Sequence, residues 1–90
     1  MNFEWDAAKA AANVRKHRVG FEEAASALKD EFAATARDLE HSATEFRYIT
    51  FGVSANRRLL AVSHTERGNS VRIISARLAT RTERKIYEEG

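Results

Sequence analysis

Two apolar runs on either side of Gly68-Asn69 constrain the fold of this chain most strongly. Leu59–Thr65 precedes this dipeptide and Val71–Arg77 follows it, a pattern typical of a β-hairpin with a short turn. Beyond the second run, Thr80 and Glu83 have the spacing of a capping box, which marks the start of a helix. The sequence therefore predicts two antiparallel strands followed by a closing helix.

The residues before the hairpin predict a second group of elements. Asp6 is a suitable N-cap, and the helix after it carries a small apolar stripe at Ala7, Ala11 and Val14 that we expect to face the core. The expected elements are a strand at Asn2–Trp5, helices at Ala7–His17 and from Phe21 to Leu28, a weak strand around residues 32–36, a loop at Asp38–Thr44 and a strand at Arg47–Val53.

This order of elements, β-α-α-β-β-β-β-α, predicts the fold class. Consecutive C-terminal strands joined by short turns favour an antiparallel meander, with two N-terminal helices and one C-terminal helix packed on it. Ninety residues suffice for one modest core, so we expect a single α+β domain over residues 1–90.

Positive charge is concentrated in the C-terminal part of the chain. Residues 1–56 contain seven basic and nine acidic side chains, whereas residues 57–90 contain eight basic and four acidic ones. This asymmetry indicates a polyanionic ligand or an acidic protein partner, and a solvated basic face is the alternative.

Several classes of protein are disfavoured by composition. The chain has no cysteine, which fits a reducing compartment, and its N-terminus has neither a signal peptide nor a membrane span, so we expect a cytoplasmic protein without membrane contact. The three histidines lack the spacing of a metal site, and no glycine-rich phosphate loop is present. No metal ligand or cofactor is predicted.

The hairpin strands carry groups suited to phosphate chemistry. An unpaired arginine in an apolar strand is costly to bury, so Arg72 either pairs with a carboxylate such as Glu66 or faces a solvent cleft. The two-residue period of a strand places Arg72 and Arg77 on opposite faces unless a bulge intervenes. His64 and Glu66 share a face and could transfer protons, or His64 could simply be a packed residue.

Cleavage of RNA without a metal ion requires three functions that these residue types can supply. A base removes the proton of the 2′-OH, cations stabilise the phosphorane, and an acid protonates the leaving 5′-oxygen. Arginine suits the second role because its planar fork can bind two phosphate oxygens.

The chain resembles the BrnT toxin family along almost its whole length. The individual fragments are short, but their ordered combination is specific. The matching residues are Phe3-Glu4-Trp5-Asp6, Lys9, Asn13, Lys16-His17, Val19, Phe21-Glu22-Glu23-Ala24, Glu45, Arg47, Gly52, Thr65-Glu66-Arg67-Gly68, Arg72-Ile73-Ile74-Ser75-Ala76-Arg77, Ala79 and Glu83-Arg84.

The resemblance implies a type II toxin with a RelE-like fold and a ribonuclease activity that blocks translation. It also implies a BrnA-like ribbon-helix-helix antitoxin as partner, in a 2:2 heterotetramer that binds operator DNA only through the antitoxin. The family usually has glycine after Lys16-His17, where this chain has Arg18. Arg18 must therefore adopt a left-handed conformation, at a cost of about 1 kcal/mol, or the turn is rebuilt around Gly20.

The candidate site follows from the matching positions together with the residue chemistry. His64 is a candidate from its chemistry alone, because it stands where the family commonly has an aromatic residue. Of all these residues, we favour Arg77 as the group that touches RNA, and we expect Lys16-His17 to form the other wall of its cleft. The catalytic candidates are Arg77, Arg72, Arg67, Glu66 and His64, and the RNA-binding candidates are Lys16, His17, Arg47 and Arg84.

Two other functions are compatible with the sequence. A non-catalytic basic module would bind nucleic acid or protein with strong salt dependence and without cleavage. A structural or dimerisation domain would pair Arg67, Arg72 and Arg77 with carboxylates and leave no cleft between them.

Overall fold

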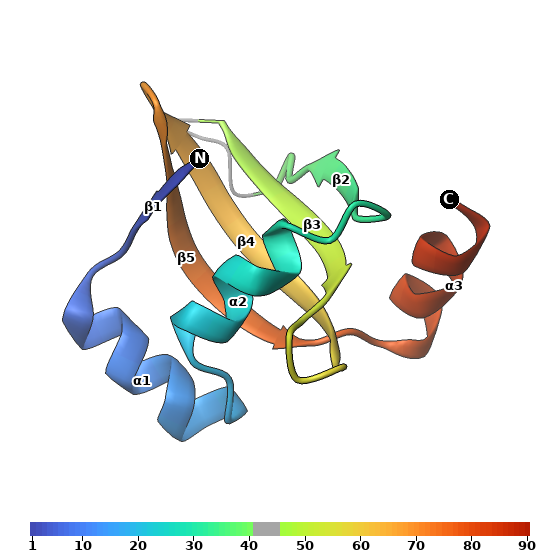
Figure 1. The fold of residues 1–90 in the computed structure, drawn as a ribbon, viewed down its shortest axis with the longest axis horizontal. Coiled ribbons are helices and arrows are strands. Elements are labelled where there is room, and N and C mark those ends of the chain that lie inside the picture. Colours follow the sequence, from blue (N-terminus) through green and yellow to red (C-terminus); the bar gives the residue numbers. More distant parts are fainter. Residues whose placement is uncertain (41–45) are drawn as a thin grey trace.

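The computed structural model describes residues 1–40 and 46–90, so His41 and Glu45 lie outside the described residues, as does most of the loop predicted at Asp38–Thr44. The predicted order of elements is confirmed (Figure 1). The elements are β1 (Asn2–Glu4), α1 (Ala7–His17), α2 (Phe21–Leu28), β2 (Ala34–Arg37), β3 (Arg47–Val53), β4 (Leu59–Arg67), β5 (Ser70–Leu78) and α3 (Arg81–Glu89).

The five strands form one sheet in the order β1-β5-β4-β3-β2. Strands β2 to β5 form the predicted antiparallel meander, and the α+β class is confirmed. The sequence did not assign a partner to the first strand, and β1 pairs in parallel with β5, with Phe3 opposite Val71, so the sheet is mixed. The first strand thus lies beside the last, on the edge that the meander leaves open.

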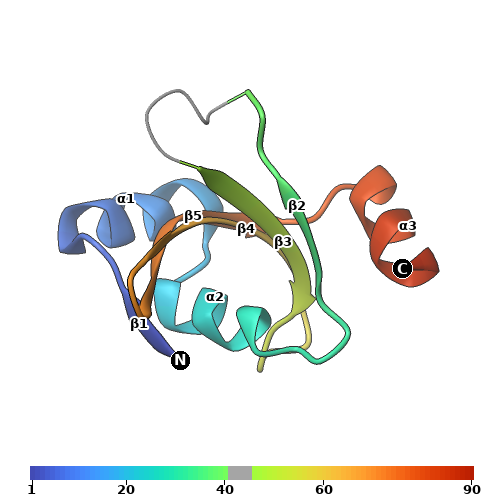
Figure 2. The ribbon, with the colours of Figure 1, turned by 90° about the horizontal axis from the view of Figure 1, so that it is seen from above.

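The sheet curves around α2, which lies inside its arc (Figure 2). Helix α2 contacts β3, β4 and β5, and the buried core lies between this helix and one face of the sheet. The fully buried members of the core include Val19, Ala24, Leu60, Val62 and Ile73. The opposite face of the sheet is therefore free of α2.

Helix α1 does not bury the stripe that its sequence predicts. Ala7 and Ala11 are exposed and Val14 is 45% exposed, whereas Asn13 is only 6% exposed. The Asn13 amide nitrogen donates to the carbonyl oxygens of Val19 (2.9 Å) and Ala76 (2.8 Å), and its oxygen accepts from the Ala76 N–H (3.1 Å). Hydrogen bonding to the backbone, rather than apolar contact, thus determines which side of α1 faces the protein.

Arg18 ends α1 in the left-handed conformation, with φ 59° and ψ 32°. Its N–H donates to the carbonyl of Val14 at 2.9 Å, as a glycine would in this C-cap motif. The turn is therefore not rebuilt around Gly20, which has an ordinary φ of −84°. The Arg18 carbonyl accepts from the guanidinium of Arg58 at 3.0 Å, an interaction that helps to hold this conformation.

A half-buried carboxylate joins α2 to the turn between β3 and β4. Glu23 accepts two hydrogen bonds from Arg58, at 2.5 and 2.9 Å, and one from the Ser54 hydroxyl at 2.6 Å. The Arg58 guanidinium is the largest cause that lowers the pKa of Glu23, to about 2, against the opposing effect of burial. The ion pair therefore contributes to stability while Glu23 is ionised.

We expect this contribution to disappear in acid. The pKa of Glu23 is depressed in the folded protein, so the stabilisation is present above the ordinary value of 4.5 and is lost as the pH falls towards 2. The shift corresponds to at most about 3 kcal/mol, and less after allowance for the one-third exposure of Arg58. Urea unfolding between pH 2 and pH 7 measures the free energy of unfolding as a function of pH. Glu23→Gln should reduce its change with pH. The same change in the variant as in the wild type would show that Glu23 is not its cause.

A polar contact holds α3 against the body, and a capping box fixes where the helix begins. The hydroxyl of Tyr87 donates to the Asp30 carboxylate at 2.6 Å, and this bond raises the pKa of Tyr87 to about 12. Thr80 and Glu83 form the predicted capping box at the start of the helix. Ile86, an apolar residue of the same helix, is 48% exposed and contributes little to this attachment. No helix in the described parts of the chain is long and apolar enough to cross a bilayer.

Candidate functional site

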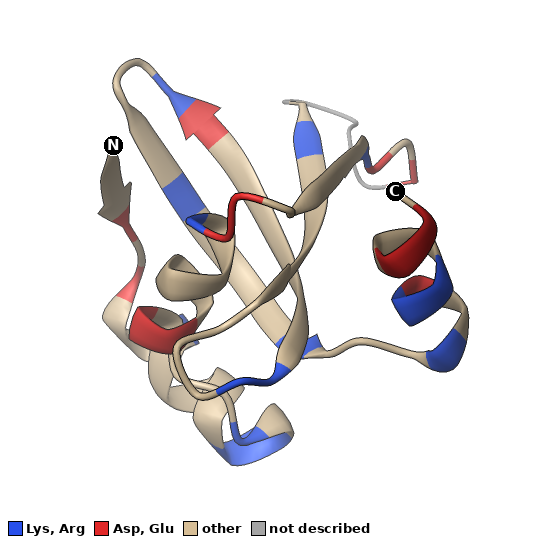
Figure 3. Cartoon of the chain, turned by 45° about the vertical axis from the view of Figure 1, so that its right-hand side comes forward, with Lys and Arg blue, Asp and Glu red and all other residues tan. Residues whose placement is uncertain are grey.

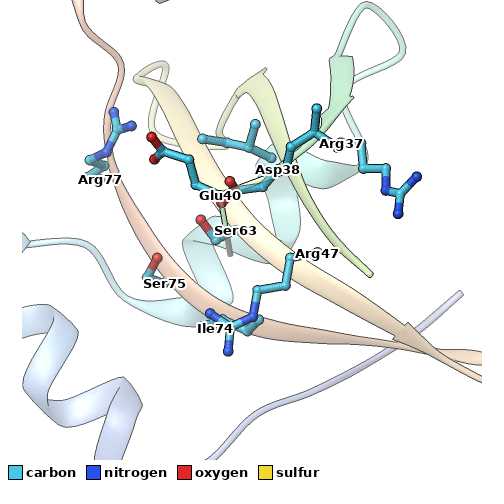
Figure 4. A pocket seen from close by; sticks show the side chains of 10 residues that line it. Arg37, Asp38, Glu40, Arg47, Ser63, Ile74, Ser75 and Arg77 are labelled. Atoms are coloured by element: carbon cyan, nitrogen blue, oxygen red, sulfur yellow. The ribbon is translucent and has the colours of Figure 1, made fainter. Parts of the chain in front are cut away.

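An open cleft of about 530 Å³ lies over the face of the sheet that α2 does not cover. Its floor is formed by β3, β4 and β5, and one wall by the end of β2 and the residues that follow it (Figure 4). Arginines, hydroxyls and carboxylates converge on it. The lining residues are Arg37, Asp38, Leu39, Glu40, Arg47, Ile49, Ser63, Ile74, Ser75 and Arg77.

Strand register explains the composition of the floor. Ile49 lies opposite Ser63, and Ser63 lies opposite Ser75, so these three residues form one row across the sheet. Val62 and Ala76 belong to the core against α2, and side chains alternate along a strand, so their neighbours in the serine row face away from that helix. Two hydroxyls are thus held on rigid strands at the centre of the cleft.

A bulge in β5 changes the relation between two candidate arginines. His64 lies opposite Ile73 whereas Ser63 lies opposite Ser75, so Ile74 is an extra residue in β5. The extra residue shifts the alternation, and Arg72 and Arg77 consequently lie on the same face as the serine row. From the sequence, the two arginines were expected on opposite faces of the strand unless a bulge intervened. The structure contains that bulge.

Arg77 lies at one end of the cleft and Arg47 at the other (Figure 4). The guanidinium of Arg77 donates to both carboxylate oxygens of Glu83, at 2.7 and 2.9 Å. This bidentate pair raises the pKa of Arg77 and, against the effect of burial, lowers that of Glu83. Helix α3 therefore fixes the orientation of Arg77 at the cleft.

Arg72 shares a face with Arg77 but is not among the residues that line the cleft. Its guanidinium lies 3.4 Å from the carboxylate of Glu4, the residue beside it on β1. The expectation that Arg72 pairs with a carboxylate is confirmed, but Glu66 is not that partner. Glu66 lies opposite Val71 and points to the other face. Arg67 lies at the end of β4, beside the hairpin turn and outside the lining set.

His64 and Glu66 share a face, as predicted, but it is the face that α2 covers. His64 is 5% exposed, stacks on Tyr48 and lies 2.7 Å from the hydroxyl of Thr50 through Nε2. Burial lowers the pKa of His64, against the attraction of Glu66. These two residues and the arginine cleft lie on opposite faces of the sheet, so one scissile phosphate cannot contact both sets.

The other RNA-binding candidates also lie away from the cleft lining. Lys16 and His17 end α1, and no lining residue among the described parts of the chain belongs to that helix. They do not form the second wall that we expected; the residues after β2 do. Arg84 belongs to α3, where lysines and arginines alternate with acids along the helix (Figure 3). The positive charge of the C-terminal part is thus spread over several surfaces.

Sequence reasoning missed most of the polar cleft residues. Ser63 lies outside the fragments that match the BrnT family and Ser75 lies inside one, but neither was chosen as a site residue, because only the register and the bulge show that they meet in the cleft. Asp38 and Glu40 fell in a segment read as a polar loop. Arg37 falls between the weak strand predicted around residues 32–36 and the predicted loop, and its guanidinium lies 4.0 Å from the ring centre of Phe46, an exposed aromatic residue.

Comparison with known proteins places this small α+β chain in a class of ribonuclease toxins. Residues 5–83 match the family model described as the ribonuclease toxin BrnT of type II toxin–antitoxin systems. The chain therefore belongs to the BrnT family, which confirms the resemblance found in its sequence. Membership in a type II system implies an antitoxin partner.

The fold is shared with a solved structure. The crystal structure of the Brucella abortus ribonuclease toxin BrnT, at 1.1 Å resolution, superposes with a TM-score of 0.70. The match covers 90% of this chain and 99% of that one at 23% sequence identity, a level that supports the fold alone. A search of curated proteins gave no match.

Proposed function

We propose that this chain is the toxin of a type II toxin–antitoxin pair and that it cleaves RNA, without a metal ion, in the cleft between Arg47 and Arg77. Cleavage of RNA would stop translation and arrest growth. The observation that supports the proposal most directly is the convergence of guanidinium, hydroxyl and carboxylate groups on one open face of the sheet. Guanidinium groups can take the charge-stabilising role that a metal ion has in other nucleases.

The cleft suits a phosphodiester chain better than a small molecule. It is open along the sheet, with a cation at each end and serines at its centre. Arg77 is held by Glu83 and can still offer further N–H groups, because guanidinium has five donors, and the bonds to Glu83 and to the carbonyl of Leu78 use three of them. A fixed donor of this kind needs little reorganisation when charge develops on the phosphorane.

A partner must keep such an activity in check. We infer a ribbon-helix-helix antitoxin in a 2:2 heterotetramer, with operator DNA bound only through the antitoxin. This part of the proposal rests on the family. A short gene beside this one that encodes a ribbon-helix-helix protein would support it, and co-expression of the two should restore growth.

Alanine variants of the two end arginines test the cleft. We expect the purified chain to cleave RNA in excess EDTA, and Arg47→Ala and Arg77→Ala to lose on the order of 10²-fold in rate, because each removes a donor to the developing charge. Single-turnover cleavage of a labelled RNA measures the rates, and growth after induction gives the matching result in cells.

Arg81→Ala is the matched control, because it removes an exposed arginine of α3 that does not line the cleft. Its rate should stay within about twofold of the wild type. Circular dichroism should show that all three variants fold. If the wild type binds RNA in a salt-dependent way without cutting it, the chain is instead a non-catalytic module. Full activity of both cleft variants would place the site elsewhere.

A further inference from the structure

We propose that Glu40 is the general base of this site, the group that takes the proton from the attacking 2′-OH. The proposal rests on the ribonuclease function proposed above and assigns one step of it to a residue. It starts from what the described cleft residues can do with a proton. Any base must lie within hydrogen-bond reach of the nucleophile, directly or through one water.

Most of the cleft residues cannot act as a base near neutral pH. The arginines keep their protons, since guanidinium is not deprotonated in proteins. Serine hydroxyls are too weakly acidic to exist as alkoxides without a base of their own, and the leucine and isoleucines carry no titratable group. Among the described residues that line the cleft, only Asp38 and Glu40 remain.

The predicted acid–base pair cannot take this role from where it lies. His64 and Glu66 are on the face of the sheet that packs against α2, and they line a separate cavity of about 140 Å³ there. A proton would have to cross the sheet to reach them from the arginine face. Among the described residues, the base must therefore come from residues 38–40, which follow β2 and line the cleft.

Position within that segment separates the two carboxylates. The last paired residue of β2 is Arg37, opposite Tyr48, and the N–H of Asp38 then donates to the carbonyl of Arg47 at 2.8 Å. This bond anchors the segment to β3 two residues before Glu40. Asp38 is half-buried at the anchor itself, whereas Glu40 is exposed and has the longer side chain.

Glu40 reaches over the floor of the cleft. Its carboxylate lies above the strands near Ser63 and points towards the end where Arg77 lies (Figure 4). An anion in that place faces the cations that would hold the phosphate. This arrangement puts a proton acceptor and charge-stabilising donors in the same cleft, around the space that the reacting phosphate would occupy.

The step balances without a co-reactant other than water. The 2′-oxygen attacks phosphorus and forms the O2′–P bond while its proton passes to the Glu40 carboxylate. The P–O5′ bond then breaks, and the 5′-oxygen takes a proton from water in the open cleft. The products are a 2′,3′-cyclic phosphate and a 5′-hydroxyl, and Glu40 returns its proton to the solvent.

The test compares Glu40→Gln with Asp38→Asn in the full chain, using a labelled RNA and the same RNA with 2′-deoxyribose at the cleavage site. We expect Glu40→Gln to cleave at least 10²-fold more slowly and to bind the uncleavable RNA within about threefold of the wild type. The wild-type rate should fall as the pH drops into the acid range, because a carboxylate base becomes protonated, and this limb should be absent in Glu40→Gln.

Asp38→Asn should keep the acidic limb of the pH–rate profile even if its rate falls, because Asp38 lines the cleft but does not take the proton, and this separates the two carboxylates. Wild-type rates in Glu40→Gln, or an acidic limb that persists in it, would overturn the assignment. Loss of the acidic limb of the pH–rate profile in Asp38→Asn, rather than in Glu40→Gln, would also overturn the assignment of Glu40 as the base. If the wild type itself does not cleave RNA, the proposed function fails first, and the two failures are thereby distinguished.

Discussion

Gly52→Ala is expected to destabilise the protein by about 3 kcal/mol or more, a large fraction of the stability of a domain this size. A Cβ at this position in β3 would overlap the carbonyl oxygen of Ala27 in α2. That oxygen also accepts from the N–H of Asp30 at 3.2 Å, so it is fixed within the end of the helix. The helix and the sheet would have to separate, and urea unfolding followed by circular dichroism measures the cost.

Gly20→Ala is the matched control. Gly20 also lies beside α2, but its φ is −84° and a Cβ there would meet nothing within 4 Å. The replacement should change the free energy of unfolding by no more than about 1 kcal/mol, the size expected for an N-cap substitution. Equal losses of stability in the two variants would contradict the prediction, because they would show that close packing of α2 on β3 has no special need for glycine at position 52.

Local chemistry made the elements predictable. The Thr80–Glu83 capping box, the Asp6 N-cap and the Gly68-Asn69 turn each act within four residues, and each is present in the structure. The parallel pairing of β1 with β5 is different, since it joins residues nearly seventy positions apart. Nothing in Asn2–Glu4 alone indicates which strand it will meet or in which direction.

The site was harder to predict because it depends on register. One extra residue in β5, Ile74, brings Arg72 and Arg77 to the same face, and the strict two-residue period that was used for prediction fails there. The same register places His64 and Glu66 on the face against α2. Residue chemistry thus indicated the right class of group, but it could not indicate which groups meet.

The ion pairs of Arg72 and Arg77 indicate different roles for these two arginines. Arg72 is held by Glu4 on the neighbouring strand, outside the cleft, whereas Arg77 is held by Glu83 at the edge of it. A purely structural domain would pair its arginines in this way too, but it would have no reason to leave a cleft with serines on its floor. The cleft therefore favours a binding or catalytic role over the structural alternative.

Asn13→Ala is expected to destabilise the protein by about 3 kcal/mol or more, and it is the second large effect that the structure predicts. Strand β1 covers one edge of β5 only as far as Arg72. Further along that edge, the N–H and C=O of Ala76 point outwards, and the Asn13 amide satisfies both of them. Removing the amide leaves three buried backbone groups without partners, and each costs about 1–3 kcal/mol unless water replaces the bond.

Val14→Ala tests whether α1 is held by the hydrogen bonds of Asn13 or by the packing of its apolar stripe. If α1 were held by its stripe, truncating Val14 would cost more than replacing its polar neighbour. Because Val14 is 45% exposed and alanine is the better helix former, the change should stay within about 0.5 kcal/mol. Urea unfolding of both variants measures the two losses of stability. A larger loss in Val14→Ala would mean that apolar packing holds α1. A larger loss in Asn13→Ala, as expected, would mean that the Asn13 amide holds α1 by its hydrogen bonds to the edge of β5.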